Sequence, residues 1–267
     1  MNAIAIGPLL ISTPRLYALG CALLLLLVSR YLLGLTPSQH GRWFNGLMVI
    51  WLLGARIVFV ALNWESYSAA PLEALKVWQP GYNALGGLIA GLIWTAWALR
   101  KRLLALIGGL AMLVGTTSLW LVFVTLAPLG NDFAIDALPE ITLEDMDGNA
   151  VNLSSLTESG DLIIVNLWAT WCPPCLREMP LLEEAAKREG VSVVVANQGE
   201  DLLPIVRYLD EQRLDFRYAL RDPSQTLMAQ FQAPGLPTTV LFDRQGTTLD
   251  VHVGELTRAQ LEQWLED

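Results

Sequence analysis

Several residue types that build catalytic or metal sites are scarce in this chain. Its 267 residues include only 3 cysteines and 2 histidines, and charged residues make up 16%. Zinc needs four ligands, and Cys21, His40 and His252 are not suitably spaced to complete a site with another cysteine pair. The sequence has no glycine loop of the nucleotide-binding type. We therefore expect no metal and no cofactor.

Acidic side chains are scarce in the first half, and basic ones are outnumbered in the second. Residues 1–137 contain four acidic and eight basic side chains, whereas residues 138–267 contain 22 acidic and nine basic ones. Phosphate binding needs a basic surface, so this acidity argues against a nucleic-acid partner. The chain is thus an apolar, weakly basic part followed by an acidic soluble part.

Long apolar stretches dominate the first half. Four of them approach the roughly 20 apolar residues that cross a bilayer: residues 16–35, 43–64, 81–99 and 103–127. No small-residue cleavage pattern follows the first stretch, so we interpret it as a retained helix rather than a signal peptide. We expect an all-α, four-helix transmembrane domain over residues 1–130, a polar linker over 131–137 and a second domain over 138–267.

The loop charges predict the orientation of these spans. Basic residues gather after the first span (Arg30, His40, Arg42) and between the third and fourth (Arg100, Lys101, Arg102), which places both loops on the cytoplasmic side. Arg15 alone favours the opposite orientation. Four crossings then put both termini outside the cytoplasm. We expect a multi-pass protein of the bacterial inner membrane whose second domain lies in the periplasm, where dithiols and disulfides exchange.

Arg56 falls inside the second predicted span. An intramembrane charge is a candidate functional residue. It is equally consistent with a structural arginine paired with a backbone carbonyl or a lipid head group.

Motifs of the first half carry a family resemblance. "IGPLLI", "GARIVFVALN", "PLEALKVWQPG" and "GGLIAG" follow one another within residues 4–95. In this order they resemble the N-terminal part of the prolipoprotein diacylglyceryl transferases, which implies a lipid-binding ancestry for Arg56. The family's histidine before the paired glycines is replaced by Leu85, which cannot transfer a proton. We therefore expect a repurposed membrane body, with diacylglyceryl transfer the less favoured activity.

Apolar runs and helical patterns alternate in the second half. "ITLEDMDGNAVNL" indicates a hairpin, "LIIVNLW", "VSVVVAN" and "PTTVLFD" indicate buried strands, and "TTLDVHV" indicates an antiparallel neighbour. Helical patterns occupy "LREMPLLEEAAKREG", "LLPIVRYLDEQR", "TLMAQFQA" and "TRAQLEQWLED". This alternation predicts an α/β domain with a central sheet covered on both faces.

The pair Cys172 and Cys175 follows the first buried strand and opens a helix. A thiol at a helix N-terminus has a lowered pKa, because unpaired N–H groups and the helix dipole favour the thiolate. Cys172 is therefore the expected nucleophile, and Cys175, one turn later, the resolving thiol. Pro173 and Pro174 remove N–H donors and should tune the redox potential, and Trp171 borders the pair. A zinc half-site and a structural disulfide are the alternatives, and both fit this setting less well.

Residues 138–267 resemble the thioredoxin fold, and specifically the membrane-tethered TlpA, ResA and CcmG-like thiol-disulfide oxidoreductases. "WATWCPPC", "REMP", "VVVANQGED", "GLPTTVLFD" and "GELTRAQLEQWL" carry the resemblance. It implies that Pro237 is cis and faces the cysteines, with the Leu236 backbone offered to the substrate. The alternative is a proline that merely starts a strand.

Two further positions depend on the same resemblance. Asn166 replaces the buried aspartate of thioredoxins and cannot carry protons. Glu178 matches the glutamate of the C-x-x-C-x-x-E pattern, which manages thiol protons in the ResA-like branch. It could equally be a solvated helix charge. Pro180 should kink the helix that carries the cysteines.

The leading hypothesis is a periplasmic protein-disulfide reductase that needs no cofactor beyond its own dithiol. Its expected partners are disulfide-bearing client proteins, a membrane electron donor and membrane lipid. The resemblance makes apocytochrome c maturation and copper-site assembly plausible pathways. A disulfide oxidase or a redox sensor would use the same residues.

Overall fold

The computed structural model describes residues 3–6, 9–69, 71–77, 79–126 and 135–266. The chain divides into two compact units, Thr13–Pro128 and Leu129–Asp267, the latter grouped with Met1–Ser12. Most of the predicted linker, residues 131–134, lies outside the described residues. Each unit is described by itself below.

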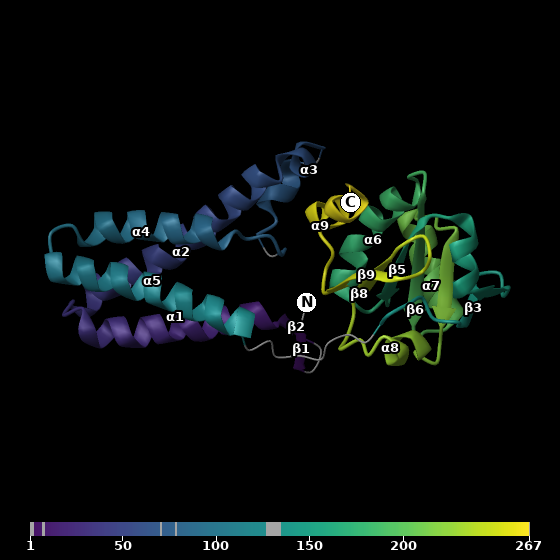
Figure 1. Ribbon diagram of the computed structural model, residues 1–267, viewed down its shortest axis with the longest axis horizontal. Helices are drawn as coiled ribbons and strands as arrows, with labels where there is room; N and C mark the ends of the chain where they lie inside the picture. The colour runs from purple at the N-terminus through teal and green to yellow at the C-terminus, as the bar shows by residue number, and fades with distance from the viewer. Residues whose placement is uncertain (1–2, 7–8, 70, 78, 127–134, 267) are drawn as a thin grey trace. The chain divides into compact units, whose positions relative to one another are not determined.

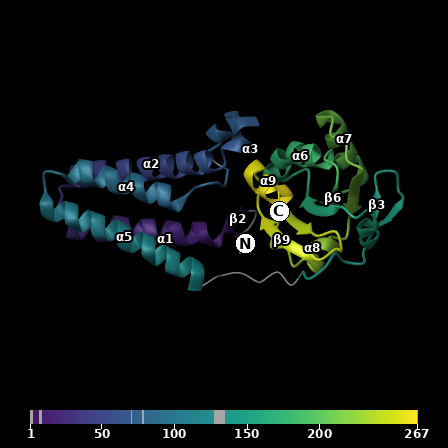
Figure 2. The same cartoon turned by 45° about the horizontal axis from the view of Figure 1, so that its top comes forward.

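Long helices build the first unit, and Figures 1 and 2 show them lying side by side. They are α1 (Thr13–Leu32), α2 (Pro37–Leu62), α4 (Ala84–Leu99) and α5 (Leu103–Leu126), with the short α3 (Trp64–Ala69) and the 3₁₀ helix η1 (Pro71–Leu75) between α2 and α4. Three of them, α1, α2 and α5, are long and apolar enough to cross a membrane. The fourth, α4, has only 16 residues.

Local signals shift the boundaries of three predicted spans. Helix α2 begins at Pro37 rather than residue 43, because a proline suits the first helical turn and Thr36 forms a capping box with Gln39. Helix α4 begins at Ala84 rather than residue 81, because the Asn83 side chain accepts a hydrogen bond from Gly86 N. Helix α1 runs over Thr13–Leu32 instead of 16–35, and Gly34 follows it with a φ of +59°.

Small residues bring α2 and α4 into close contact. A Cβ on Gly54 would lie 3.0 Å from the Gly86 carbonyl oxygen, and a Cβ on Gly86 would lie 2.9 Å from the Gly54 carbonyl oxygen. Trp94 Nε1 donates to the Trp43 carbonyl at 2.9 Å. The paired glycines of the transferase-like motif therefore serve packing here. Leu85, at the position of the family's histidine, is exposed on the helix surface.

A short hairpin precedes α1, formed by β1 (Ala3–Ile6) and β2 (Leu9–Ser12). Sequence patterning did not predict it.

A mixed seven-stranded sheet forms the second unit, with strand order β4-β3-β7-β6-β5-β8-β9. Its strands are β3 (Thr142–Asp145), β4 (Ala150–Asn152), β5 (Leu162–Trp168), β6 (Val191–Gln198), β7 (Tyr218–Asp222), β8 (Thr238–Phe242) and β9 (Thr248–Val253). Strand β5, next to the middle strand β6, pairs parallel to β6 and antiparallel to β8. The expected β3–β4 and β8–β9 hairpins are present. Strand β7, between the second and third predicted strands, was missed.

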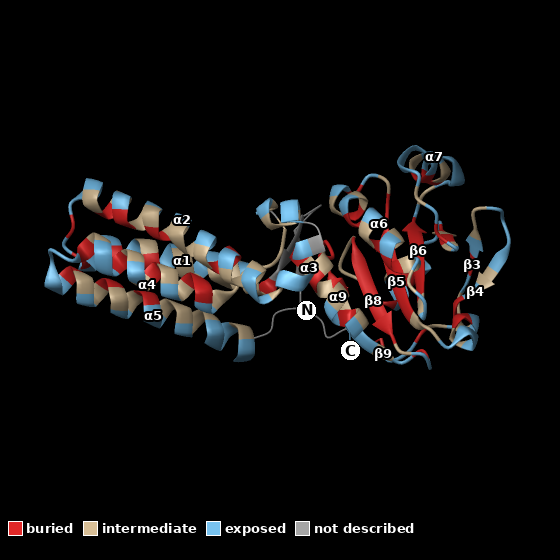
Figure 3. Ribbon diagram, turned by 90° about the horizontal axis from the view of Figure 1, so that it is seen from above, coloured by how far each residue is buried: buried red, intermediate tan, exposed pale blue. Residues whose placement is uncertain are grey.

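Helices cover both faces of this sheet, and Figure 3 shows the buried strands between them. Helices α6 (Pro173–Ala186), α7 (Leu202–Gln212) and α9 (Arg258–Glu266) supply one hydrophobic cluster, whereas η2 (Leu153–Ser159) and α8 (Thr226–Gln230) supply the other. The strands are apolar on both sides because both faces are covered. This arrangement confirms the expected fold class, a helical domain followed by an α/β thioredoxin-fold domain.

Candidate active site

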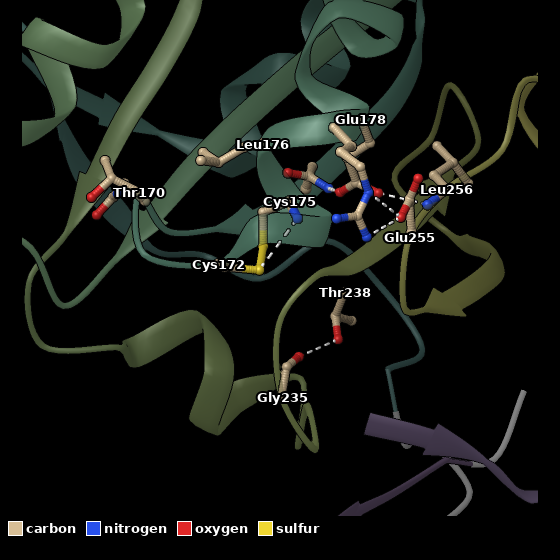
Figure 4. The surroundings of a disulfide bond; sticks show 12 residues. Thr170, Cys172, Cys175, Leu176, Glu178, Gly235, Thr238, Glu255 and Leu256 are labelled. Atoms are coloured by element: carbon tan, nitrogen blue, oxygen red, sulfur yellow. Dashed lines mark hydrogen bonds and ion pairs between the residues drawn. A yellow bond between two sulfur atoms is a disulfide. The ribbon is translucent and has the colours of Figure 1, made fainter. Parts of the chain in front are cut away.

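The two cysteines lie where β5 passes into α6. Cys172 is the N-cap of α6 and forms a disulfide with Cys175, with their Cα atoms 5.3 Å apart. Cys175 N donates to Cys172 Sγ at 3.3 Å (Figure 4). The C-x-x-C spacing thus places one sulfur at the N-terminal end of the helix and the other one turn in, where the helix dipole favours negative charge on Cys172.

Pro173 and Pro174 occupy the first two positions of α6. Neither has an N–H to offer, so the Cys175 N–H is the donor that the first helical turn provides to Cys172 Sγ. The cysteines themselves are buried, while the neighbouring Trp171 is 64% exposed. An exposed aromatic side chain therefore borders a nearly covered disulfide.

The Leu236–Pro237 peptide bond is cis, as the resemblance implies. Thr238 Oγ1 donates to the Gly235 carbonyl at 2.8 Å, and Gly254 N donates to the Pro237 carbonyl at 2.9 Å. Leu236 packs against the hydrophobic cluster that contains both cysteines. Figure 4 shows Gly235 and Thr238 in the surroundings of the disulfide. The structure therefore brings the predicted docking segment to the dithiol.

Glu178 is buried, which rules out the alternative of a solvated helix charge. Asn166 Nδ2 donates to its Oε1 at 2.6 Å, and Leu256 N donates to its Oε2 at 2.6 Å. Asn166 Nδ2 also donates to Thr239 Oγ1 at 2.9 Å. Glu178 thus connects α6, the helix that carries the cysteines, to strand β5 and to the loop before α9.

Burial raises the pKa of Glu178 from 4.5 to about 8. The hydrogen bonds from Leu256 and Asn166 act against this rise, and the nearby Glu255 carboxylate adds to it. Desolvation outweighs the two donors because a carboxylate loses far more hydration on burial than two hydrogen bonds restore. A carboxyl group with this pKa changes protonation state near neutral pH.

Glu255 and Arg177 flank this buried acid. Arg177 Nε and Nη2 both donate to Glu255 Oε2, at 2.8 and 2.5 Å. Their ion pair joins α6, three residues before Pro180, to the loop between β9 and α9. The residue after Glu255 in this loop, Leu256, is the one whose N–H donates to Glu178. The loop between β9 and α9 is thereby fixed against the cysteine helix.

Glu200 is a site residue that the sequence reasoning missed. Its carboxylate accepts hydrogen bonds from Thr170 N at 2.6 Å and Asn197 Nδ2 at 2.7 Å, and it also bonds the Thr170 hydroxyl. Thr170 lies two residues before Cys172 on the connection from β5 to α6. An acid just after β6 could have indicated this contact, because neighbouring parallel strands end at the same edge of a sheet.

Pro180 lies inside α6, which continues to Ala186. A proline cannot donate to the carbonyl four residues earlier, which here belongs to Leu176. Tyr208 Oη, from α7, donates to that carbonyl at 3.3 Å. A neighbouring helix thus replaces the missing bond, and the expected kink stays a prediction.

In the first unit, Arg56 is buried and surrounded by backbone oxygens. Its five N–H donors reach carbonyls at 3.0–3.4 Å, those of Glu73, Ala74, Lys76, Pro80 and Gly81. The rings of Tyr67 and Tyr82 lie 5.6 and 5.8 Å from its guanidinium carbon. These contacts favour the structural interpretation of Arg56 over lipid head-group binding, since no donor is left for a phosphate.

Among the described residues, no group of three or more His, Cys, Asp or Glu side chains has the arrangement of a metal site.

Comparison with known proteins agrees with this geometry. The Redoxin family model matches residues 134–265, and the prolipoprotein diacylglyceryl transferase model matches residues 3–128. The thiol-disulfide oxidoreductase ResA of Halalkalibacterium halodurans is 33% identical over 127 residues, which cover 46% of this chain and 70% of ResA. ResA of Geobacillus kaustophilus is 34% identical over 131 residues, covering 48% of this chain and 74% of that protein.

A solved structure covers a similar share of the chain. A thiol:disulfide interchange protein of the thioredoxin family from Chlorobium tepidum aligns over 51% of this chain and 97% of its own, with 26% identity and a TM-score of 0.43. The first unit of the present chain is similar to prolipoprotein diacylglyceryl transferase. By the similarity of its second unit, the chain belongs to the ResA family of thiol-disulfide oxidoreductases.

Proposed function

We propose that this oxidoreductase is a membrane-anchored disulfide reductase that acts on client proteins in the bacterial periplasm. The apolar helices of the first unit support the anchoring, and the basic loops between them support the outward placement of the dithiol. Outside the cytoplasm the dithiol needs reduction from the membrane, so a membrane dithiol carrier is the proposed electron donor. No lipid transfer is proposed, because Leu85 cannot move a proton.

The reaction is a pair of thiol-disulfide exchanges. The Cys172 thiolate attacks one sulfur of the client disulfide, forming a mixed disulfide and expelling the other client sulfur as a thiolate, which takes up a proton. The Cys175 thiol then loses its proton and attacks Cys172 Sγ, which releases the second client thiol. The client gains two electrons and two protons, and the Cys172–Cys175 disulfide forms. The carrier returns two electrons for the next cycle.

Glu178 is proposed to hold the proton that Cys175 releases. It lies one helical turn beyond Cys175, so the two side chains share a face of α6. Its pKa of about 8 lies close to the value of about 8.5 of an ordinary thiol, so the group can take up or give up a proton in the same pH range as Cys175. Within the described part of the chain, the Oδ1 atom of Asn166 is buried without a hydrogen-bond partner, so rotation of the amide would present an acceptor to the protonated carboxyl. Asn166 thus changes its hydrogen bond to Glu178 when the carboxyl group is protonated, but does not itself take up the proton.

The residues in the first turn of α6 favour the reductase direction. Thiol-disulfide oxidoreductases that act as oxidases stabilise the thiolate of their reduced form. Here Pro173 and Pro174 withhold two N–H donors from Cys172, and burial of both cysteines disfavours a charged sulfur. A less stabilised thiolate makes the reduced state the better electron donor. Trp171, Leu236 and Pro237 are the proposed docking residues for the client.

The direction is tested by the reduction potential of the purified full-length protein in glutathione buffers. We expect a value below about −220 mV, in the range of thioredoxin rather than of oxidases near −120 mV. Insulin reduction should also be measured, and Cys172→Ala should abolish it. A potential near the oxidase value, or no insulin reduction by the wild type, would overturn the proposed direction.

The client is identified with Cys175→Ala, which leaves Cys172 able to attack but removes the resolving thiol. We expect mixed disulfides to accumulate on Cys172 in cells, with extracytoplasmic thiol proteins such as apocytochromes among the trapped species. Cys21→Ala is the matched control and should trap nothing. Failure to trap any protein would argue against a client-directed role.

A further inference from the structure

Helix α4 is too short to cross a bilayer. Its 16 residues rise by about 24 Å, against a hydrocarbon core of about 30 Å. The 26 residues of its packing partner α2 rise by about 39 Å. If both helices cross the same bilayer, other residues must complete the crossing at one end of α4.

The missing part lies before α4. The helix ends at Leu99, directly followed by Arg100, Lys101 and Arg102, which mark a membrane boundary. At the other end, Asn83 N donates to the Ala55 carbonyl at 3.0 Å, so α4 begins beside Ala55. Helix α2 continues for seven more residues, to Leu62, a rise of about 10 Å. The chain before α4 therefore lies beside the last turns of α2.

Six backbone carbonyls of this preceding segment accept hydrogen bonds from side chains of the same unit. Arg56 donates to five of them, within residues 73–81, and Tyr82 Oη donates to the Val77 carbonyl. Gly81 has a φ of +123°, and a Cβ there would lie 2.8 Å from Arg56 Nη1. A loop in water needs no such arrangement, whereas non-helical backbone at membrane depth does.

The outer surface of the same segment is apolar. Leu72, Leu75 and Val77 are between 55% and 77% exposed, comparable to Ile57 and Leu62 on the exposed face of α2. Glu73 and Lys76 pair at 3.4 Å, which offsets the segment's charges. The segment thus has exposed apolar side chains, paired charges and hydrogen-bonded carbonyls. Such a surface is better suited to contact with lipid acyl chains than with water.

We propose that residues 71–77 and 79–82 lie inside the outer boundary of the bilayer as a segment of 3₁₀ helix and irregular backbone that completes the crossing begun by α4. Leu72, Leu75 and Val77 contact lipid, and Arg56 satisfies the backbone in place of water. Arg56 is thus a structural residue that lets irregular backbone exist at membrane depth.

The proposal is tested by fluorescence quenching on single-cysteine variants of the full-length protein. Cys21→Ser is the background, and the Cys172–Cys175 disulfide is kept oxidised so that it takes no label. A bimane label is placed on Leu72→Cys, Leu75→Cys or Val77→Cys, and the protein is reconstituted in phosphatidylethanolamine–phosphatidylglycerol vesicles. Ile57→Cys serves as the lipid reference and Asp147→Cys, in the β3–β4 turn, as the water reference.

We expect doxyl-labelled lipid to quench the three loop labels as it quenches Ile57→Cys, with loss of the iodide quenching shown by Asp147→Cys. Iodide quenching at the water-reference level would overturn the proposal. So would protection from both quenchers, because it would show that protein, such as the redox domain or a second copy, covers the segment.

The role of Arg56 is tested with Arg56→Lys in the Leu75→Cys protein. A lysine has three donors for five carbonyls, so we expect lipid quenching to fall and iodide quenching to rise. Arg42→Lys, at an exposed position in the first turns of α2, is the matched control. Unchanged quenching in Arg56→Lys would overturn this role. If that variant does not fold, the measurements with Arg56 intact still decide where the segment lies.

Discussion

Arg56 in the helical unit and Glu178 in the redox unit are both almost completely buried, with exposed fractions of 5% and 1%. Their surroundings differ. Every N–H group of Arg56 donates to a backbone carbonyl. Glu178 receives two hydrogen bonds, and burial still raises its pKa to about 8.

This difference separates a structural charge from a reactive one. A cation whose donors are all used holds its partners in place and has no reason to change state. When hydrogen bonds do not fully offset the burial of an acid, its pKa rises toward neutral pH and the group can change protonation state. In our proposal, the membrane unit uses its buried charge to order a loop, and the redox unit uses its own to hold a proton.

The largest effect is expected for Arg56→Met, which keeps the apolar stem but removes every donor. Five carbonyls then lose their partner, and we expect a loss of about 3 kcal/mol or more in the stability of the membrane unit. Thermal unfolding of the detergent-solubilised protein measures it, with Arg42→Met as the control. Insulin reduction by the surviving folded fraction should stay unchanged. A melting temperature equal to that of the control would contradict the structural role.

Glu178→Gln should change how stability depends on pH. The folded protein holds this proton more tightly than the unfolded chain, so the group's stabilising contribution is complete below pH 4.5 and disappears as pH rises to about 8. The slope from this group is at most about 1.4 kcal/mol per pH unit. Denaturant unfolding of the oxidised protein from pH 4 to 9 measures it.

The glutamine variant should lack this decline and should exceed the wild type in stability at pH 9. The matched control, Glu189→Gln, replaces an exposed acid near the C-terminal end of α6 and should follow the wild type. Parallel pH profiles for Glu178→Gln and the wild type would mean that the carboxyl group is ionised at neutral pH, and that the contrast with Arg56 is wrong.

Local sequence signals predicted much of this structure. The alternation of apolar runs and helical patterns predicted the α/β domain, because strands covered on both faces must be continuously apolar. The position of Cys172 at a helix start followed from its spacing after β5. The burial of Glu178 could not be decided, since one carboxylate on a helix has the same local pattern whether a loop covers it or not.

Contacts between distant segments account for what was missed. Glu200 bonds Thr170 across two strands, and the Arg56 contacts join α2 to a loop 17 to 25 residues later. Strand β7 was missed because "FRYALRD" carries charges at both ends and only a short apolar centre. The start of α4 was predicted three residues early, because a span judged by its apolar length does not locate the Asn83 N-cap.

Pro174→Ala should shift the reduction potential by a smaller amount. The alanine restores an N–H in the first turn of α6, which can stabilise the Cys172 thiolate. A hydrogen bond to a charged group is worth about 1.5 kcal/mol, which corresponds to about 30 mV for this two-electron couple. The potential should rise, making the protein a weaker reductant, as measured by equilibration with glutathione. A fall in potential would show that the prolines do not act by withholding donors.

The smallest effect is expected for Glu200→Gln, which tests whether every acid near the dithiol behaves like Glu178. Glu200 is only partly buried, and it accepts two hydrogen bonds from Thr170 and one from Asn197. A glutamine keeps an accepting oxygen but loses the charge, so we expect a stability loss of about 1 kcal/mol without a change in its pH dependence. Denaturant unfolding at pH 5 and pH 8 measures both quantities. If the loss differs between the two pH values as it does for Glu178→Gln, proximity to the dithiol, and not burial, makes an acid reactive in this domain.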